Sequence, residues 1–101
     1  MTVFHFGEKL VAALEGDSRK RILRVLSCGE RNIESIAEDL RICADEVRRE
    51  ASILQDVNLV ESARSGSEEY WRLMPDAERI VANFLANNHL PASEEYCKLI
   101  R

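Results

Sequence analysis

Three arginines in the stretch RICADEVRREASILQD, residues 41–56, have the chemistry needed to bind a nucleic acid. A guanidinium group pairs with phosphate oxygens and donates two parallel hydrogen bonds to the major-groove edge of guanine. The same stretch contains four acids, which are Asp45, Glu46, Glu50 and Asp56. Acids repel phosphates, but they also accept from the cytosine amino group and stabilise the start of a helix. The sequence therefore predicts a nucleic-acid site only where the arginines outweigh these acids locally.

Length and charge limit the classes of protein to which the chain can belong. Its 101 residues are enough for one domain, and its net charge of −4 argues against a general nucleic-acid coat protein. A local basic surface for sequence-specific binding stays compatible with that charge. The N-terminus lacks the pattern of a signal peptide, and no apolar run reaches the length of a membrane span. We expect a cytoplasmic protein with no membrane contact.

Apolar periodicity indicates which elements position the arginines. Helical spacing recurs in residues 3–15, 18–28, 33–40, 44–57 and 76–89. Asp17 or Ser18 offers an N-cap for the second helix, and Asn32 offers one for the third. Asn58 tolerates the left-handed conformation that ends the fourth helix.

The fourth helix has two faces and is followed by a change of period. Its apolar face consists of Val47, Ala51 and Leu54. Its opposite face consists of Ala44, Asp45, Arg48, Arg49 and Ser52. Over residues 59–74 the period changes from helical to alternating around Gly66, which predicts a β-hairpin.

Three helices followed by a hairpin, with a tight turn before the helix at 44–57, define a winged helix-turn-helix. We predict a mainly α fold with a small β-hairpin, an α+β arrangement in a single domain over residues 1–101. The expected segments are an N-terminal helix at 3–15, the winged helix-turn-helix core at 17–74, a C-terminal helix at 76–89 and a tail at 92–101.

Residues 17–76 resemble the winged-helix domain of the ArsR-type transcriptional regulators. The segment DSRKRILRVLSCGERNIESIAEDL is similar to the opening helix and the first helix of the helix-turn-helix in that family. ADEVRREASILQDVNLVES is similar to its recognition helix, and SGSEEYWRLMPDAERI to the returning strand of its wing. The resemblance implies a repressor that binds a palindromic operator in double-stranded DNA. It also implies a homodimer formed through the N-terminal and C-terminal helices.

The resemblance further implies which residues face DNA. These are Arg41, Ala44, Asp45, Arg48, Arg49, Ser52, Arg64 and Ser65. We expect Arg48 and Arg49 to bind phosphates or guanine, and Arg64 in the wing to contact the DNA backbone or minor groove. Alternatively, Arg48 and Arg49 form ion pairs along their own helix. Asp45 and Glu46 either read cytosine or only stabilise the start of the helix.

Cys28, Cys43 and Cys97 are an odd number of cysteines at wide spacing, without a CxxC pair. Reduced thiols in a cytosolic protein are the simplest interpretation. Cys43 is predicted at the N-cap of the helix at 44–57, where the helix dipole favours a thiolate, so it is a possible redox thiol. Zinc needs three or four converging ligands, so the isolated Cys43 and His89 predict no metal site. We expect no cofactor, and no motif indicates an enzyme.

Charge elsewhere in the chain supports two further expectations. The basic cluster of Arg19, Lys20, Arg21 and Arg24 is expected to form a solvated helix face. The acids of residues 41–56, together with Glu68 and Glu69, favour an alternative function, a winged-helix module that binds another protein and little or no DNA. Such a protein would act as an adaptor or as an antagonist of another regulator.

Overall fold

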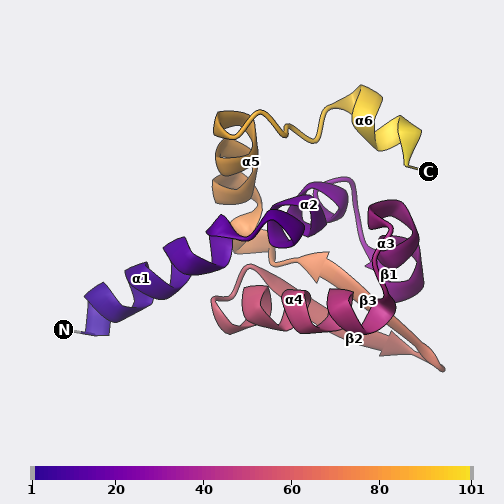
Figure 1. Cartoon of the computed structure of the whole chain (residues 1–101), viewed down its shortest axis with the longest axis horizontal. Helices are drawn as coiled ribbons and strands as arrows, with labels where there is room; N and C mark the ends of the chain where they lie inside the picture. Colours follow the sequence, from indigo (N-terminus) through magenta and orange to yellow (C-terminus); the bar gives the residue numbers. More distant parts are fainter. Residues whose placement is uncertain (1, 101) are drawn as a thin grey trace.

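A computed structural model describes the backbone of residues 2–100 and the side chains of residues 7–100. The elements are α1 (Thr2–Glu15), α2 (Asp17–Leu26), β1 (Arg31–Asn32), α3 (Ile33–Leu40), α4 (Ala44–Asp56), β2 (Val60–Ser65), β3 (Glu68–Leu73), η1 (Pro75–Ala77), α5 (Glu78–Asn87) and α6 (Glu94–Leu99). Helices α2, α3 and α4 pack on one another, the hairpin of β2 and β3 lies beside α4, and α1 projects from this body (Figure 1). The predicted winged helix-turn-helix is confirmed.

The turn between α3 and α4 follows from the local sequence. Asn32 caps α3 as predicted, since its side-chain oxygen accepts from the backbone N–H of Ser35 at 2.8 Å. Arg41 ends the helix in the left-handed conformation, with φ of 58°. For a residue other than glycine, this conformation costs about 1–2 kcal/mol. The packing of the surrounding structure must therefore hold the backbone of Arg41 in it. Cys43 is the extended N-cap residue of α4 and gives it no side-chain cap.

Helix α4 and the wing, defined as β2 and β3, agree with the predicted pattern. Val47, Ala51 and Leu54 are fully buried in the core. Asn58 leaves the helix at φ of 62°, and Gly66 at the hairpin tip has φ of 65°. The two strands are antiparallel and in register along their whole length. The polar face of α4 is therefore directed away from the core.

The sheet contains a third strand that the sequence did not predict. The two residues of β1, Arg31 and Asn32, pair with Trp71 and Tyr70 of β3, which gives the strand order β1-β3-β2. Two residues are too few to display a period, so no pattern could have indicated this strand. Its pairing attaches the start of α3 to the wing.

Several predicted helix ends were wrong by a few residues. Neither Asp17 nor Ser18 is the N-cap of α2, because Gly16 occupies that position and Asp17 is already helical. The last helix was predicted at 76–89, but a 3-10 turn precedes α5, which ends at Asn87. Helix ends depend on backbone hydrogen bonds that apolar periodicity does not report. None of the helices in the described part of the chain is long and apolar enough to cross a membrane.

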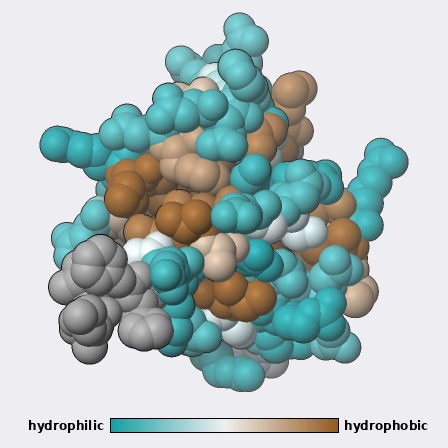
Figure 2. Space-filling model, turned by 60° about the vertical axis from the view of Figure 1, so that its left-hand side comes forward, coloured by the Kyte–Doolittle hydropathy of each residue, from teal (hydrophilic) through white to brown (hydrophobic). Residues whose placement is uncertain are grey.

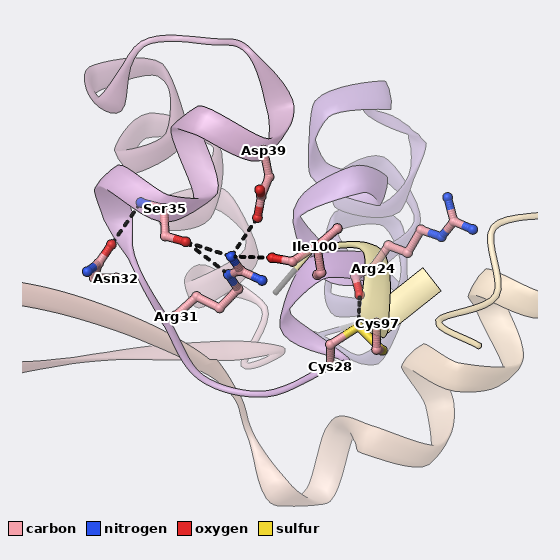
Figure 3. Close-up of polar contacts among 8 residues, drawn as sticks. All are labelled: Arg24, Cys28, Arg31, Asn32, Ser35, Asp39, Cys97 and Ile100. Atoms are coloured by element: carbon pink, nitrogen blue, oxygen red, sulfur yellow. Dashed lines mark hydrogen bonds and ion pairs between the residues drawn. A yellow bond between two sulfur atoms is a disulfide. The ribbon is translucent and has the colours of Figure 1, made fainter. Parts of the chain in front are cut away.

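The tail folds back over α2 and α3 as a C-terminal clasp, which we define as residues 91–100. Figure 3 shows the bond between Cys28, after α2, and Cys97 in α6, whose Cα atoms lie 5.4 Å apart. The prediction of reduced thiols is therefore wrong for these two cysteines. They are separated by 69 positions, and only the fold brings them together. The guanidinium of Arg24 also lies 3.8 Å from the centre of the Tyr96 ring.

A second set of contacts joins the clasp to α3. The Arg31 side chain donates to the Ile100 carbonyl at 3.0 Å and to the Ser35 hydroxyl at 2.6 Å (Figure 3). It also forms an ion pair with Asp39 at 2.7 Å. The end of the clasp is thus held by the residue that begins β1, next to the helix-turn-helix.

The bond between Cys28 and Cys97 should raise the stability of the protein. Because it closes a long loop in the unfolded chain, Cys97→Ser should lower the free energy of unfolding by about 2–4 kcal/mol. Thermal unfolding of the oxidised protein measures this, with Cys43→Ser as the control, since Cys43 is the exposed free thiol. Titration of the unfolded, unreduced chain should find one thiol; three thiols would contradict the pairing.

Candidate nucleic-acid interface

The polar face of α4 is partly exposed to solvent and partly covered by neighbouring residues. Asp45, Arg48 and Arg49 are exposed, whereas Ala44 and Ser52 are half-buried. The Ser52 hydroxyl donates to the carbonyl of Arg48 one turn earlier, at 2.8 Å. The predicted face is therefore present, but its serine hydroxyl donates within its own helix.

Arg48 joins α4 to the wing. Its guanidinium donates to Asp45 at 2.8 Å, one turn earlier in α4, and to Glu69 of β3 at 3.3 Å. The hydrogen bond and charge of Glu69, followed by those of Asp45, hold the pKa of Arg48 above its ordinary value. The alternative prediction, that Arg48 forms an ion pair within its own helix, is thus confirmed by its contact with Asp45. Two carboxylates compete with any phosphate for this cation.

Glu69 makes a second contact that the sequence analysis missed. Its other oxygen accepts from the indole N–H of Trp71 at 3.0 Å, and Trp71 is buried. The two residues are two positions apart on one strand, so they share a face. That alternation is the sequence signal that would have revealed the pair. A single carboxylate therefore connects a core side chain to α4.

Glu50 does not lie on the open face of α4. One oxygen of its carboxylate accepts from Arg19 of α2 at 2.7 Å, and the other lies 4.0 Å from Nε of Arg49. The expectation that Arg19 and Arg24 belong to a solvated face was also wrong. Arg19 is directed toward Glu50, and Arg24 is covered by the clasp at Tyr96. Both contacts join residues far apart in the chain, which periodicity cannot indicate.

Two further arginines flank α4 with their charge uncompensated. Arg41 lies in the turn before α4, and Arg64 lies near the tip of the wing beside Ser65; all three are exposed. Within residues 7–100, neither Arg41 nor Arg64 forms an ion pair. Together with the exposed Arg49, they are cations on and beside α4 that a ligand could reach.

Cys43 is exposed at the N-cap of α4, as predicted, and its thiol is free. The other two cysteines are bonded to each other, so no second free thiol of this chain is left to pair with it. Over the described residues, no group of three or more His, Cys, Asp or Glu side chains converges to hold a metal ion. Asp45 and Glu46 lie in the first turn, where their charge stabilises the uncapped helix start.

Solved structures provide the comparison, since no protein-family model and no curated protein matches the chain. Mb0332 from Mycobacterium bovis, a homodimeric winged helix-turn-helix DNA-binding domain and possible ArsR-family transcriptional regulator, superposes with a TM-score of 0.77. It is 27% identical, and the match covers 92% of this chain and 89% of that one. The chain is similar to the ArsR-type winged-helix regulators.

Two other solved structures share the fold. ZitR from Lactococcus lactis is 26% identical with a TM-score of 0.65, over 83% of this chain and 59% of its own. NolR from Sinorhizobium fredii has a TM-score of 0.76 over 89% of this chain and 90% of its own. At 18% identity, NolR shows only a common fold.

The contact between Glu69 and Trp71 should contribute to stability in this ArsR-like fold. Glu69→Ala should lower the free energy of unfolding by about 1–3 kcal/mol, because the buried indole N–H would lose its acceptor. Urea unfolding followed by the fluorescence of Trp71, the single tryptophan, measures the change. Glu68→Ala is the control, because Glu68 bonds the exposed hydroxyl of Tyr70. Equal losses in the two variants would show that the indole bond has no special role.

Proposed function

We propose that this ArsR-like chain is a sequence-specific DNA-binding transcriptional regulator, a dimeric repressor that binds a palindromic operator through α4 and the wing. The observation that carries the proposal is the placement of three exposed arginines. Arg41 precedes α4, Arg49 lies on its open side and Arg64 lies in the wing. Mb0332, which is similar over most of its length, is a DNA-binding domain.

Each arginine has a distinct role in this proposal. Arg49 enters the major groove with α4, where a guanidinium reads guanine or binds the flanking phosphates. Arg41 binds a phosphate beside the groove, and Arg64 with Ser65 contacts the backbone or the minor groove. Arg48 contributes less direct contact, because Asp45 and Glu69 already bind its guanidinium.

Helices α1 and α5 supply the surface for a second copy of the chain. Val11 of α1 and Ile80 of α5 are 56% and 50% exposed, so each of these helices presents a large aliphatic side chain at the surface. Apolar residues reach the surface on the side from which α1 projects (Figure 2). A symmetric dimer places its two recognition helices about one turn of DNA apart, on one face of the duplex.

The proposed function has a consequence for the C-terminal clasp. A regulator of transcription shares a compartment with DNA, so the proposal places the chain in the cytoplasm, where thiols are normally kept reduced. The bond between Cys28 and Cys97 depends on the redox state of that compartment, whereas the contacts of Arg24 and Arg31 with the clasp need no oxidation.

Selection of duplexes from a random pool at low salt tests the function directly. We expect enrichment of an inverted repeat, with affinity that falls steeply as salt is added. On the enriched operator, Arg49→Ala should weaken binding by about 1–3 kcal/mol, measured by fluorescence anisotropy. Lys98→Ala, which removes one positive charge from α6, is the control. Unchanged affinity of the Arg49 variant would remove this residue from the interface.

The role of Asp45 can be separated from that of the arginines. Asp45→Asn removes one negative charge and releases one bond to Arg48, so it should tighten binding to every duplex, by about 0.3–1 kcal/mol. Anisotropy on the operator and on an unrelated duplex measures both affinities. A loss confined to the operator would instead show that Asp45 accepts from a cytosine.

The alternative, a winged helix that binds another protein, is favoured by one observation. Arg48 is bound by two carboxylates, which lowers the positive charge offered at the centre of α4. Failure of the selection to enrich any duplex, together with recovery of one stoichiometric protein partner, would favour this function over DNA binding.

A further inference from the structure

The side chain of Arg19 lies at the junction between α1 and α4. Its Nε donates to the carbonyl of Ala13 at 2.7 Å, and one terminal nitrogen donates to the carbonyl of Ala12 at 3.1 Å. These carbonyls belong to the last turn of α1, where no backbone N–H of the same helix is available to donate to them. The other terminal nitrogen donates to Glu50 of α4 at 2.7 Å. One guanidinium therefore connects the projecting helix to the recognition helix.

The sequence leaves space for this guanidinium at Gly16. Gly16 has φ of −69° and ψ of 131°, a conformation that any residue can adopt, so the backbone does not require glycine. A methyl group there would lie 2.8 Å from Nε of Arg19 and closer still to Cζ and one terminal nitrogen. A side chain at position 16 would therefore displace the guanidinium of Arg19 from its present place.

The junction is well shielded from solvent. The side chains of Arg19 and Glu50 are each only 17% exposed. Planar guanidinium groups that donate to several fixed acceptors hold one orientation, which an ammonium group does not. Only Gly16 separates α1 from α2, so the direction of α1 is defined by this short connection, by the packing of Ala13 and Leu14 on the core, and by the contacts of Arg19. The other oxygen of Glu50 faces Arg49, the predicted base-reading residue.

We infer that Arg19 is a positioning residue that fixes the angle between α1 and α4, and thereby the spacing of operator half-sites that the dimer accepts. This inference rests on the proposed function, in which α1 contributes to the dimer and α4 enters the groove. The dimer binds two half-sites at once only when both recognition helices reach them together. If the angle at the junction is fixed, both helices reach their half-sites at only one spacing. If the angle varies, the dimer can bind half-sites at several spacings.

Binding to a series of duplexes tests this inference. The half-sites of the selected palindrome are placed at their natural spacing, roughly 10 base pairs between centres, and then moved apart or together in single base pairs. The wild-type dimer should lose about tenfold or more in affinity when the spacing is wrong. Gly16→Ala displaces the guanidinium, and Glu50→Ala removes its acceptor on α4. Both variants should bind the natural spacing more weakly and show a flatter spacing profile.

Matched controls separate positioning from stability and charge. Glu95→Ala removes one acid from α6, where the side chain is exposed, just as Glu50→Ala removes one acid from α4. This control should keep the wild-type profile. Glu50→Gln keeps an oxygen that can accept from Arg19, so its profile should return toward that of the wild type. Light scattering and thermal unfolding verify that each variant is a folded dimer.

The outcomes distinguish this inference from the proposed function. If the wild-type protein binds a palindrome, and Gly16→Ala, Glu50→Ala and Glu50→Gln all retain its spacing profile, Arg19 only caps α1 and the inference is wrong. A wild-type protein that binds no palindrome at any spacing would refute the proposed function, and the inference with it. A merely structural role lowers stability and leaves the preferred spacing as sharp as before.

Discussion

The orientation of α4 is the constraint on which the other features of this protein depend. One face of the helix is buried in the core through Val47, Ala51 and Leu54. The burial of this apolar surface supplies most of the free energy that holds α4 against its neighbours. A buried stripe alone lets a helix rotate or slide slightly against its neighbours. Glu50 on one flank and Arg48 on the other bind α2 and the wing, respectively. The half-exposed pairs of Arg48 contribute little stability, but together with the shielded pair of Glu50 they define how the open face of α4 is presented.

These flanking pairs also change the interpretation of the acids on α4. Asp45 and Glu50 each bind an arginine at 2.8 Å or less. Glu69, in the wing, also binds Arg48, so this one cation is shared between two carboxylates. Coulomb repulsion between a phosphate and a paired carboxylate is weaker than between a phosphate and an isolated one. These pairs therefore reduce, without cancelling, the repulsion that the acids of this stretch exert on a polyanionic partner.

Features determined by neighbouring residues were predictable, and features determined by distant ones were not. Periodicity identified the buried stripe of α4, and side-chain chemistry identified Asn32 as a cap and Asn58 as a left-handed exit. No spacing rule relates Arg19 to Glu50, which are 31 positions apart, or pairs Cys28 with one of two other cysteines. The predicted DNA-facing residues occupy the expected surface, and their contacts with DNA stay a prediction.

The clasp and the flanking pairs act on different parts of the fold. Cys97, Tyr96 and Ile100 contact α2, the residues after it and the start of α3, and none of these contacts involves α4. Opening the disulfide therefore removes a constraint on the unfolded chain and leaves the support of α4 by Arg19 and Glu69 in place. The stability of the fold and the orientation of α4 can thus be changed separately in this chain, because they depend on different side chains.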